Sequence, residues 1–220
     1  MPGAQPSLPR PRPARVALGG RYARLEPLAA AHAPDLFEAS TGTGAEARFA
    51  YLFDVPPASP ADMTAWIAKA SATEDPQFSA VIDLASGRAA GRQALMRITP
   101  EHGVIEIGNI LWGPAIARTR VATEALYLAA RHVFEDLGYR RFEWKCNDLN
   151  EPSKAAARRF GFSYEGLFRQ HMWVKGRNRD TAWFAMIDTE WPRIKAAFER
   201  WLDPANFDAA GRQKSRLQIL

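Results

Sequence analysis

NDLNEPSKAAARRFGF, residues 147–162, describes a short helix set between two strands. Pro152 suits a first helical position, because the backbone N–H that proline lacks would have no partner there. Asn150 stands two residues earlier, with a side chain that can accept a bond from the free donors of a helix start. Gly161 is the type of residue that ends a helix in the left-handed conformation. The stretch therefore predicts a capped helix over residues 152–160.

The start of this helix offers groups that a ligand could use. Free backbone N–H groups, the amide of Asn150 and the hydroxyl of Ser153 can together hold a polar, anionic ligand. An ordinary capped surface helix explains the same residues equally well. The choice between the two depends on the segments that flank the helix.

The composition indicates one domain with a sizeable core. The chain has 220 residues, of which 47% are apolar and 11% aromatic. It contains no run of about 18 apolar residues and no apolar signal region at its N-terminus. The one cysteine, Cys146, excludes an internal disulfide and suits a reducing compartment. We therefore expect a cytoplasmic protein with no membrane partner, and Cys146 as a buried strand residue rather than a nucleophile.

The net charge of +5 comes from the N-terminal end of the chain. Residues 1–25 hold five of the 29 bases and no acid, which leaves 24 bases against 24 acids. A nucleic-acid-binding domain would carry its positive charge on the folded body, so we expect no nucleic-acid partner. Residues 1–18, rich in Pro and Arg, are expected to be a disordered leader, and residues 203–220 a C-terminal tail.

Periodicity and turn residues predict strands mixed with helices. An amphipathic helix is expected over residues 121–137, because its apolar residues form one stripe: Ala122, Leu126, Ala129, Val133 and Leu137. The other expected helices are 29–40, 59–72, 152–160 and 190–201, and the expected strands are 22–26, 78–84, 89–98, 104–112, 141–146, 168–174 and 181–187. This order predicts an α/β (α+β) domain with a mixed, mostly antiparallel sheet and one helical crossover.

The order of these elements and a series of short motifs resemble the GNAT superfamily of acyl-CoA N-acyltransferases. The likeness is strongest to the branch that acetylates the N-termini of ribosomal proteins. The motifs are Arg24-Leu25-Glu26-Pro27-Leu28, Ile107–Trp112 with Ala122–Ala125, Asn150-x-x-Ser153 with Gly161-Phe162, Glu165–Arg169, Asp180, Trp183-Phe184 and Glu190-Trp191. The resemblance implies one acyl-CoA N-acyltransferase domain over residues 19–202, with a sheet that is splayed at its centre and has helices on both faces.

The resemblance also implies acetyl-CoA as the co-substrate. Its pantetheine would pair with strand 104–112 where that strand leaves strand 141–146, and its pyrophosphate would lie at the start of helix 121–137. Arg120 stands where the family usually has a glycine, so the guanidinium groups of Arg118 and Arg120 would assist phosphate binding. The implied cofactor-binding residues are Leu111, Trp112, Arg118, Thr119, Arg120, Val121, Ala122, Thr123, Asn150 and Ser153.

Three residues are candidates for the chemistry of acetyl transfer by direct attack in a ternary complex. Many relatives protonate the leaving thiolate with a tyrosine, but Ala157 stands at that position, so Ser153 becomes the candidate donor. Its alternative role is simply a hydroxyl on the first helical turn. Glu106 is the first candidate for the base, with an ordinary solvent-facing glutamate as the alternative. His171 is the second, because a histidine titrates near neutrality.

The acceptor is expected to be a primary amine: a peptide N-terminus, an amino-acid-like amine or a small-molecule amine. Residues 49–53 and Trp66 would make its site aromatic, with fewer acids than a polyamine needs. The sequence has no metal-ligand spacing, so no metal is expected. A homodimer is suggested by family analogy. The alternative function is a catalytically silent acyl-CoA-binding or structural GNAT domain, which Arg120 and the missing tyrosine favour.

Overall fold

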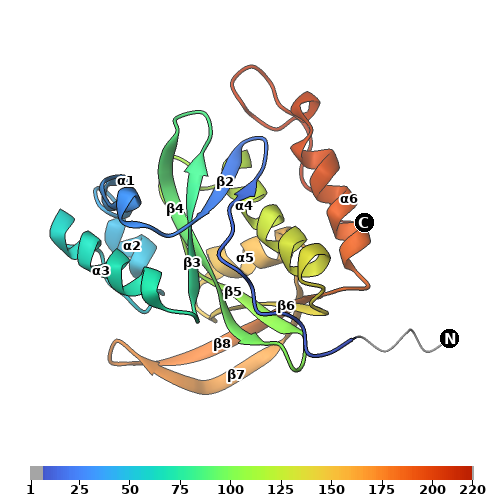
Figure 1. The fold of residues 1–220 in the computed structure, drawn as a ribbon, viewed down its shortest axis with the longest axis horizontal. Coiled ribbons are helices and arrows are strands. Elements are labelled where there is room, and N and C mark those ends of the chain that lie inside the picture. The colour runs from blue at the N-terminus through green and yellow to red at the C-terminus, as the bar shows by residue number, and fades with distance from the viewer. Residues whose placement is uncertain (1–6, 220) are drawn as a thin grey trace.

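One mixed sheet forms the centre of the molecule (Figure 1). The computed structural model describes residues 7–219. Within them the strands are β1 (Leu18–Gly19), β2 (Ala23–Pro27), β3 (Gln77–Asp83), β4 (Arg88–Thr99), β5 (Val104–Trp112), β6 (Arg141–Asn147), β7 (Ser163–Val174) and β8 (Arg177–Ile187). Their order in the sheet is β1-β2-β3-β4-β5-β6-β8-β7. Among these strands only β5 and β6 pair in parallel, so the chain crosses over between them.

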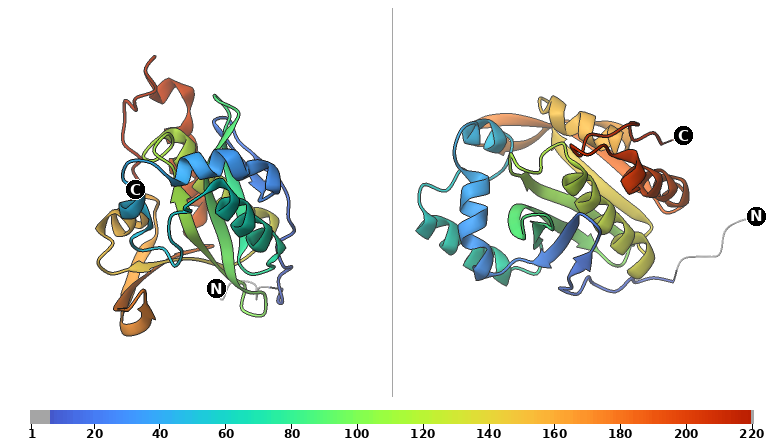
Figure 2. Two further views of the ribbon diagram at one scale, coloured as in Figure 1. Left: turned by 90° about the vertical axis from the view of Figure 1, so that its left-hand side faces the viewer. Right: turned by 90° about the horizontal axis from the view of Figure 1, so that it is seen from above.

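Helices cover both faces of this sheet (Figure 2). The helices are α1 (Ala33–Ser40), α2 (Ala45–Phe49), α3 (Pro60–Ala72), α4 (Arg120–Arg131), α5 (Glu151–Arg159) and α6 (Trp191–Leu202). α1 and α3 enclose one apolar core, while α4, α5 and α6 enclose a larger one on the opposite face. The expected mixed, mostly antiparallel sheet with helices on both faces is therefore confirmed.

The crossover helix differs from the expected one at its C-terminal end. The predicted stripe from Ala122 to Leu137 is buried, because α4 packs between the sheet and α6. The α-helix itself ends at Arg131 and continues as a π-helical turn, His132–Asp136. Within that turn His132 Nδ1 lies 2.7 Å from Asp136 Oδ2. Apolar periodicity of this length does not distinguish an α-helical turn from a π-helical one.

Residues 8–13 lie against the sheet, in contrast to the disordered leader expected over residues 1–18. The backbone N–H of Arg10 donates to the Pro100 carbonyl (2.9 Å), and the Tyr139 hydroxyl donates to the Pro11 carbonyl (3.1 Å). Gln77 donates in the same way to Pro13 (3.0 Å). Prolines lack an N–H but keep their carbonyl as an acceptor, so a Pro-rich segment can be held by bonds to its carbonyl groups. Residues 1–6 of the expected leader lie outside the described residues.

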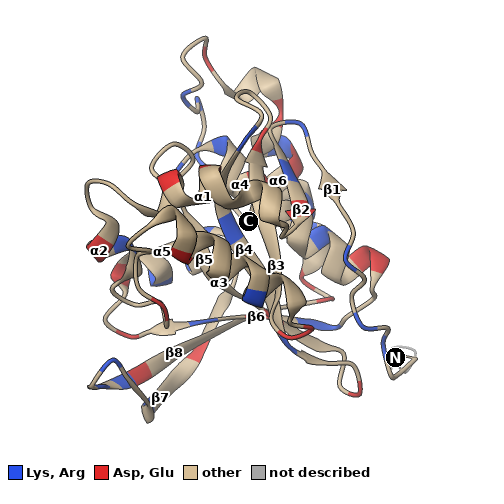
Figure 3. Cartoon of the chain, turned by 60° about the vertical axis from the view of Figure 1, so that its left-hand side comes forward, with Lys and Arg blue, Asp and Glu red and all other residues tan. Residues whose placement is uncertain are grey.

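Charged residues are spread over many of the described helices and strands (Figure 3). Blue and red segments are interspersed over the helices and strands in Figure 3, and basic residues do not gather on one element in that view. This distribution agrees with the balance of 24 bases and 24 acids beyond residue 25.

Candidate functional site

β5 and β6 separate in the middle of the sheet. They pair from Val104↔Arg141 to Ile107↔Trp144, and no pairing joins them beyond that point although both strands continue. On its other side, β5 has a bulge where its pairing with β4 shifts between Gly108 and Leu111. Asn109, in this bulge, has a φ of 50°, a conformation that asparagine adopts more readily than most residues. The backbone of residues 108–110 is therefore open, as an exposed strand edge is.

A cavity of about 110 Å³ lies in this opening. Residues 106–110 of β5 and 144–147 of β6 line it, together with Asn150 and Ser153 at the start of α5. Residues 51–53, which follow α2, and Arg179 of β8 also line it. The structure thus brings Glu106, Asn150 and Ser153, which were selected from the sequence, to one cavity.

Ser153 has a fixed position at the first turn of α5. Its Oγ accepts a bond from Trp144 Nε1 (3.0 Å), and its backbone N–H donates to Asn150 Oδ1 (3.1 Å). Because the indole N–H uses only a lone pair of the hydroxyl oxygen, the hydroxyl hydrogen can still be donated. The cap uses only the oxygen of Asn150, so its NH₂ group remains for a ligand. The helix start is thus both capped and equipped with polar groups that line the cavity.

Cys146 lines the same cavity and is buried. Burial raises the pKa of its thiol, and the nearby Ser153 hydroxyl opposes this effect only in part. The thiolate, rather than the thiol, is the nucleophilic form of cysteine. The structure therefore agrees with Cys146 as a buried strand residue.

Glu106 is 2% exposed and is held by two cations. Arg97 Nη1 donates to both carboxylate oxygens (2.8 and 2.7 Å), and Lys145 Nζ lies 2.9 Å from Oε2. Lys145 is the first residue of β6 beyond the last pair with β5, so this ion pair lies at the apex of the opening. The burial excludes the solvent-facing glutamate that the sequence left as an alternative, while the role of Glu106 as a base stays a prediction.

The ion pairing continues across the sheet. Lys145 Nζ also lies 2.6 Å from Glu143 Oε2, and Arg141 Nε lies 2.7 Å from Glu143 Oε1. Arg141 Nη1 then donates to Glu165 Oε1 (2.8 Å). Buried carboxylates are tolerated when cations compensate them in this way. We call this series the ion ladder: Arg97, Glu106, Lys145, Glu143, Arg141 and Glu165.

His171 lies on β7 and is exposed. Its Nδ1 is 3.0 Å from Thr181 Oγ1, and its ring contacts Phe168 edge-on at 5.5 Å. Partial burial lowers the pKa of His171, and the positive charges of Arg179, Arg97 and Lys145 lower it further. The imidazole is therefore neutral at pH 7, the form a base needs. His171 is not among the residues that line the cavity, and its catalytic role stays a prediction.

The first turn of α4 has the geometry of an anion site. Thr119 caps it, because its Oγ accepts from the Val121 N–H (3.2 Å). The first-turn N–H groups of Arg120 and Ala122 have no intrahelical partner, as in any α-helix. The Thr123 hydroxyl accepts a bond from Arg159 Nη1 (3.2 Å). Helix starts with such free donors bind phosphate groups in many proteins.

The two arginines expected to bind phosphate lie in different environments. Arg118 is exposed, has a φ of 65° and has no partner among the described residues. The guanidinium of Arg120 lies over the rings of Tyr22 (4.4 Å) and Phe207 (5.3 Å). The left-handed position of this loop thus falls on Arg118, while Arg120 begins the helix with ordinary backbone. Arg118 is the freer of the two side chains.

Leu111 and Trp112 lie beyond the open part of β5. Leu111 is 3% exposed and pairs with Arg92, and Trp112 Nε1 donates to Gln93 Oε1 (3.3 Å). Neither lines the cavity, whereas residues 106–110 do. The open segment begins earlier than expected because of the bulge at Asn109. A Gly-Asn pair within a strand was the signal that could have identified it.

Two arginines at the site were not predicted. Arg179 is 7% exposed, donates from Nε to Thr181 Oγ1 (3.3 Å) and lies over the Phe53 ring (5.1 Å). Arg159 lies over Trp201 (4.9 Å) and reaches the start of α4. Burial lowers the pKa of both guanidinium groups. Neither has a carboxylate partner among the described residues, and no residue pattern distinguishes them from ordinary surface arginines.

An apolar hollow of about 420 Å³ lies between α1, α2 and α3 and shares Phe53 with the cavity. Phe49 and Trp66, which the sequence assigns to an acceptor site, line it. Arg92 in its wall contacts Asp54 Oδ2 (2.5 Å) and lies over the Trp66 ring (4.2 Å). Asp54 is thus compensated within the protein and offers little to a polyamine.

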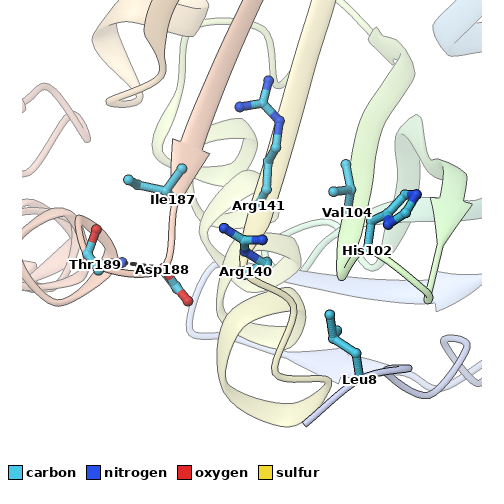
Figure 4. A pocket seen from close by; sticks show the side chains of 8 residues that line it. All are labelled: Leu8, His102, Val104, Arg140, Arg141, Ile187, Asp188 and Thr189. Atoms are coloured by element: carbon cyan, nitrogen blue, oxygen red, sulfur yellow. Dashed lines mark hydrogen bonds between the residues drawn. The ribbon is translucent and has the colours of Figure 1, made fainter. Parts of the chain in front are cut away.

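A further hollow, of about 440 Å³, lies at the opposite end of β5 and β6 (Figure 4). Val104 and Arg141, the first pair of these strands, line it together with Leu8 and Ile187. The strands are joined by hydrogen bonds there, so no backbone is open to a ligand. The described residues contain no cluster that could hold a metal ion, and no described helix is long and apolar enough to cross a membrane.

Comparisons with known proteins agree with this arrangement. The model of the acetyltransferase (GNAT) domain matches residues 23–163. A GCN5-related N-acetyltransferase from Brucella melitensis is 58% identical, with 98% of each chain covered and a TM-score of 0.95. A probable GNAT-family acetyltransferase from Chromobacterium violaceum is 38% identical, with 87% of this chain and 100% of that chain covered and a TM-score of 0.77.

A more distant protein shares the fold alone. RimL, a ribosomal L7/L12 alpha-N-protein acetyltransferase, is 20% identical, with 78% of this chain and 94% of that chain covered and a TM-score of 0.68. A comparison with curated proteins finds no match. The resemblance inferred from the short motifs is confirmed by the matched domain and by the two relatives above 30% identity. The chain belongs to the GNAT family of acetyltransferases.

Proposed function

We propose that this protein transfers an acetyl group from acetyl-CoA to a primary amine within the opening between β5 and β6. The observation that carries the proposal is the position of Ser153, whose hydroxyl lines a cavity bounded by the open backbone of residues 108–110. The acceptor would be a peptide N-terminus, an amino-acid-like amine or a small-molecule amine. A polyamine is disfavoured, because Glu106 and Asp54 are already compensated by cations.

The chain has groups that fit each part of the co-substrate. The free edge of β5 can pair with the amides of the pantetheine arm, and the NH₂ group of Asn150 can assist. The first turn of α4, with Thr119 and Thr123, suits the pyrophosphate. Arg118 and Arg159 supply cations without carboxylate partners beside that turn. Bound acetyl-CoA would supply an activated thioester.

The chemistry requires few side chains of the protein. Open backbone N–H groups in the bulge of β5, at residues 108–110 rather than near the paired Leu111 and Trp112, would stabilise negative charge that develops on the carbonyl oxygen. Ser153 would donate its hydroxyl hydrogen toward the leaving sulfur while Trp144 holds its oxygen. Glu106 or His171 would accept the proton of the amine, directly or through water.

A catalytically silent acyl-CoA-binding domain is the second candidate, favoured by one observation. The Glu106 carboxylate accepts three short contacts from Arg97 and Lys145, so a proton would have to displace one of them. A silent domain would bind acetyl-CoA and release no thiol with any amine.

The test has two steps. Titration with acetyl-CoA to about 100 times its Kd should raise the free energy of unfolding by about 2.7 kcal/mol, or roughly 5–10 °C in Tm. Release of free CoA with a panel of amines then separates an enzyme from a binding domain. An unshifted Tm would contradict acetyl-CoA binding altogether.

The Ser153→Ala variant tests the proposed acid. We expect kcat to fall by about 10²-fold or more, with the KM for acetyl-CoA little changed, because the hydroxyl acts only as the thiolate leaves. Ser163→Ala, at the exposed start of β7, is the control. An unchanged kcat would restrict Ser153 to holding Trp144.

Location and assembly are also proposals. A cytoplasmic protein that forms a homodimer is consistent with the single buried cysteine and with family analogy. Light scattering of the purified protein would measure the mass of the assembly.

A further inference from the structure

The lining of the cavity has an unequal charge. Four cationic residues contribute to it, Arg48, Arg97, Lys145 and Arg179, against one acid, Glu106. Arg97 and Lys145 are occupied by Glu106, as described above. Arg48 is occupied by the backbone, because its Nη1 and Nη2 donate to the carbonyls of Thr43 and Thr41. The remaining cation, Arg179, has no such role.

Arg179 is buried to more than nine-tenths and keeps most of its donors unused. Its Nε donates to Thr181 Oγ1, and neither terminal nitrogen donates to a described residue. These nitrogens are not sealed in the protein, because they keep some exposed surface and the residue lines the cavity. A guanidinium presents its terminal N–H groups as a planar fork that matches an oxyanion.

The guanidinium plane is held in place by its neighbours. Phe53 lies against it at 5.1 Å, and Lys175 fixes the segment that carries Phe53 by donating to the carbonyls of Phe49 (3.0 Å) and Asp54 (2.7 Å). An oriented cation without a counterion is costly to bury, and burial lowers the pKa of Arg179 accordingly. Such a residue is expected where a ligand brings the missing negative charge.

We infer that the acceptor of this enzyme is an amine that also carries an oxyanion, a carboxylate or a phosphate, which Arg179 binds through its guanidinium fork. The inference rests on the proposed acetyl transfer in this opening and names the chemical class of its acceptor. The amine would lie toward Ser153 and the open β5 backbone, and the oxyanion toward β8. Arg97, Lys145 and Arg48 would add attraction at longer range, since the residues that line the cavity include four cations and one acid.

The test measures binding without turnover. The enzyme saturated with CoA, the product, is titrated with three amines of similar length: 4-aminobutanoate, 4-aminobutanamide and 2-aminoethyl phosphate. A pair of dipeptide amides, Ser-Asp and Ser-Asn, extends the comparison to peptide N-termini. We expect a Kd at least about 10-fold lower for an oxyanion-bearing amine than for its neutral counterpart. Comparing the Kd values of 4-aminobutanoate and 2-aminoethyl phosphate shows whether a carboxylate or a phosphate is preferred.

Variants assign the effect to one side chain. Arg179→Gln should abolish the preference, and Arg179→Lys, which keeps the charge but loses the fork, should retain only part of it. Arg177→Gln, an exposed arginine on the same strand, removes the same charge and should leave the preference unchanged. The Tm of Arg179→Gln without ligand should equal or exceed that of the wild type. If the Gln variant does not fold, the Lys variant decides.

Three outcomes would overturn the inference: equal Kd values for charged and neutral amines, no measurable binding of any oxyanion-bearing amine, or a preference that survives in Arg179→Gln. Different results would contradict the proposed acetyl transfer itself. These are no stabilisation by acetyl-CoA, or no CoA release with any amine, whatever the binding preference.

Discussion

Single side chains at the opening differ in how far their polar atoms are already used. Glu106 has three short cationic contacts, and Ser153 accepts a bond on its oxygen while its hydroxyl hydrogen is within reach of the Cys146 sulfur. Arg179 uses one of its nitrogens only. A side chain whose donors and acceptors are all used supports the fold, whereas one with unused donors or acceptors can bind a ligand.

The titration of His171 gives a prediction for stability. The ordinary pKa of a histidine is 6.5, and the folded protein lowers the pKa of His171 below this value. The unfolded chain therefore binds the proton of His171 more tightly than the folded protein does. The free energy of unfolding should therefore fall as the pH decreases through about 6.5 and below. The Tm loss between pH 8 and pH 5 should be smaller in His171→Gln than in the wild type. Since His171 is exposed, the difference should be small.

The substitution also removes the contact of His171 with Thr181, which lowers the Tm equally at both pH values. Comparing the Tm difference between pH 8 and pH 5 in the wild type and in the variant cancels this effect. Equal Tm losses, or a larger loss in the variant, would show that His171 does not bind protons more weakly in the folded state.

Some residues of the site could be predicted from local sequence, and others depend on contacts between distant parts of the chain. Asn150 and Ser153 could be selected because a helix cap has local rules, and both line the cavity. Arg179 could not, because an arginine in a strand reads as solvent-facing until Phe53, more than a hundred residues away, packs over it. Arg159 has the same difficulty with Trp201. Burial of a long cationic side chain is a property of tertiary structure.

At the scale of elements, Glu124 joins α4 to the first strands. Its carboxylate, 5% exposed, accepts the backbone N–H groups of Arg21 (2.9 Å), Tyr22 (2.5 Å) and Ala23 (2.7 Å). A Cβ on Gly20 would lie 2.5 Å from this carboxylate, so the turn between β1 and β2 closes tightly around it. One side chain thus accepts three consecutive backbone N–H groups of this turn.

We expect Glu124→Gln to destabilise the protein markedly. A glutamine presents one oxygen, and its NH₂ group would face backbone donors that the carboxylate now accepts. Loss of charge-assisted bonds should cost about 1.5–3 kcal/mol, or roughly 3–12 °C in Tm. Glu101→Gln, in an exposed turn, should change the free energy of unfolding by less than about 0.5 kcal/mol. Equal effects of the two substitutions would refute the role of Glu124.

Elements with a repeated pattern could be predicted, while short or irregular ones could not. β5 was expected with its observed bounds, because Gly103 and Gly113 enclose an apolar strand. α2 has five residues, too few to show a helical period. The Gly-Asn pair of β5 is a local signal for its bulge, but the opening beside it also depends on pairing with β4 and on separation from β6, which local sequence does not contain. The irregular positions of β5 are those that form the cavity.

At the scale of the whole molecule, the N-terminal segment and the opening lie at opposite ends of β5 and β6. Leu8 lines the hollow beside Val104 and Arg141, where the two strands begin to pair. The opening starts after Ile107↔Trp144, further along the same strands. Stability supplied at one end should therefore be separable from ligand binding at the other.

Deletion of residues 1–13 tests this separation. It removes the bonds that Pro11 and Pro13 accept and the one that Arg10 donates, so the free energy of unfolding should fall by about 1–3 kcal/mol. The increase in Tm on saturation with acetyl-CoA should stay the same, because that site is remote. Loss of the ligand-induced increase would mean that the leader reaches the opening.

The ion ladder has a mechanical consequence. It joins β4, β5, β6 and β7 through side-chain ion pairs, and its contacts of Glu106 with Arg97 and Lys145 lie where β5 and β6 separate, beside their last hydrogen-bonded pair. Separating one buried ion pair leaves an uncompensated charge in the interior, which costs about 3–5 kcal/mol. We therefore expect the angle between β5 and β6 to be fixed, and in the proposed acetyl transfer this angle would limit the width of the acyl group.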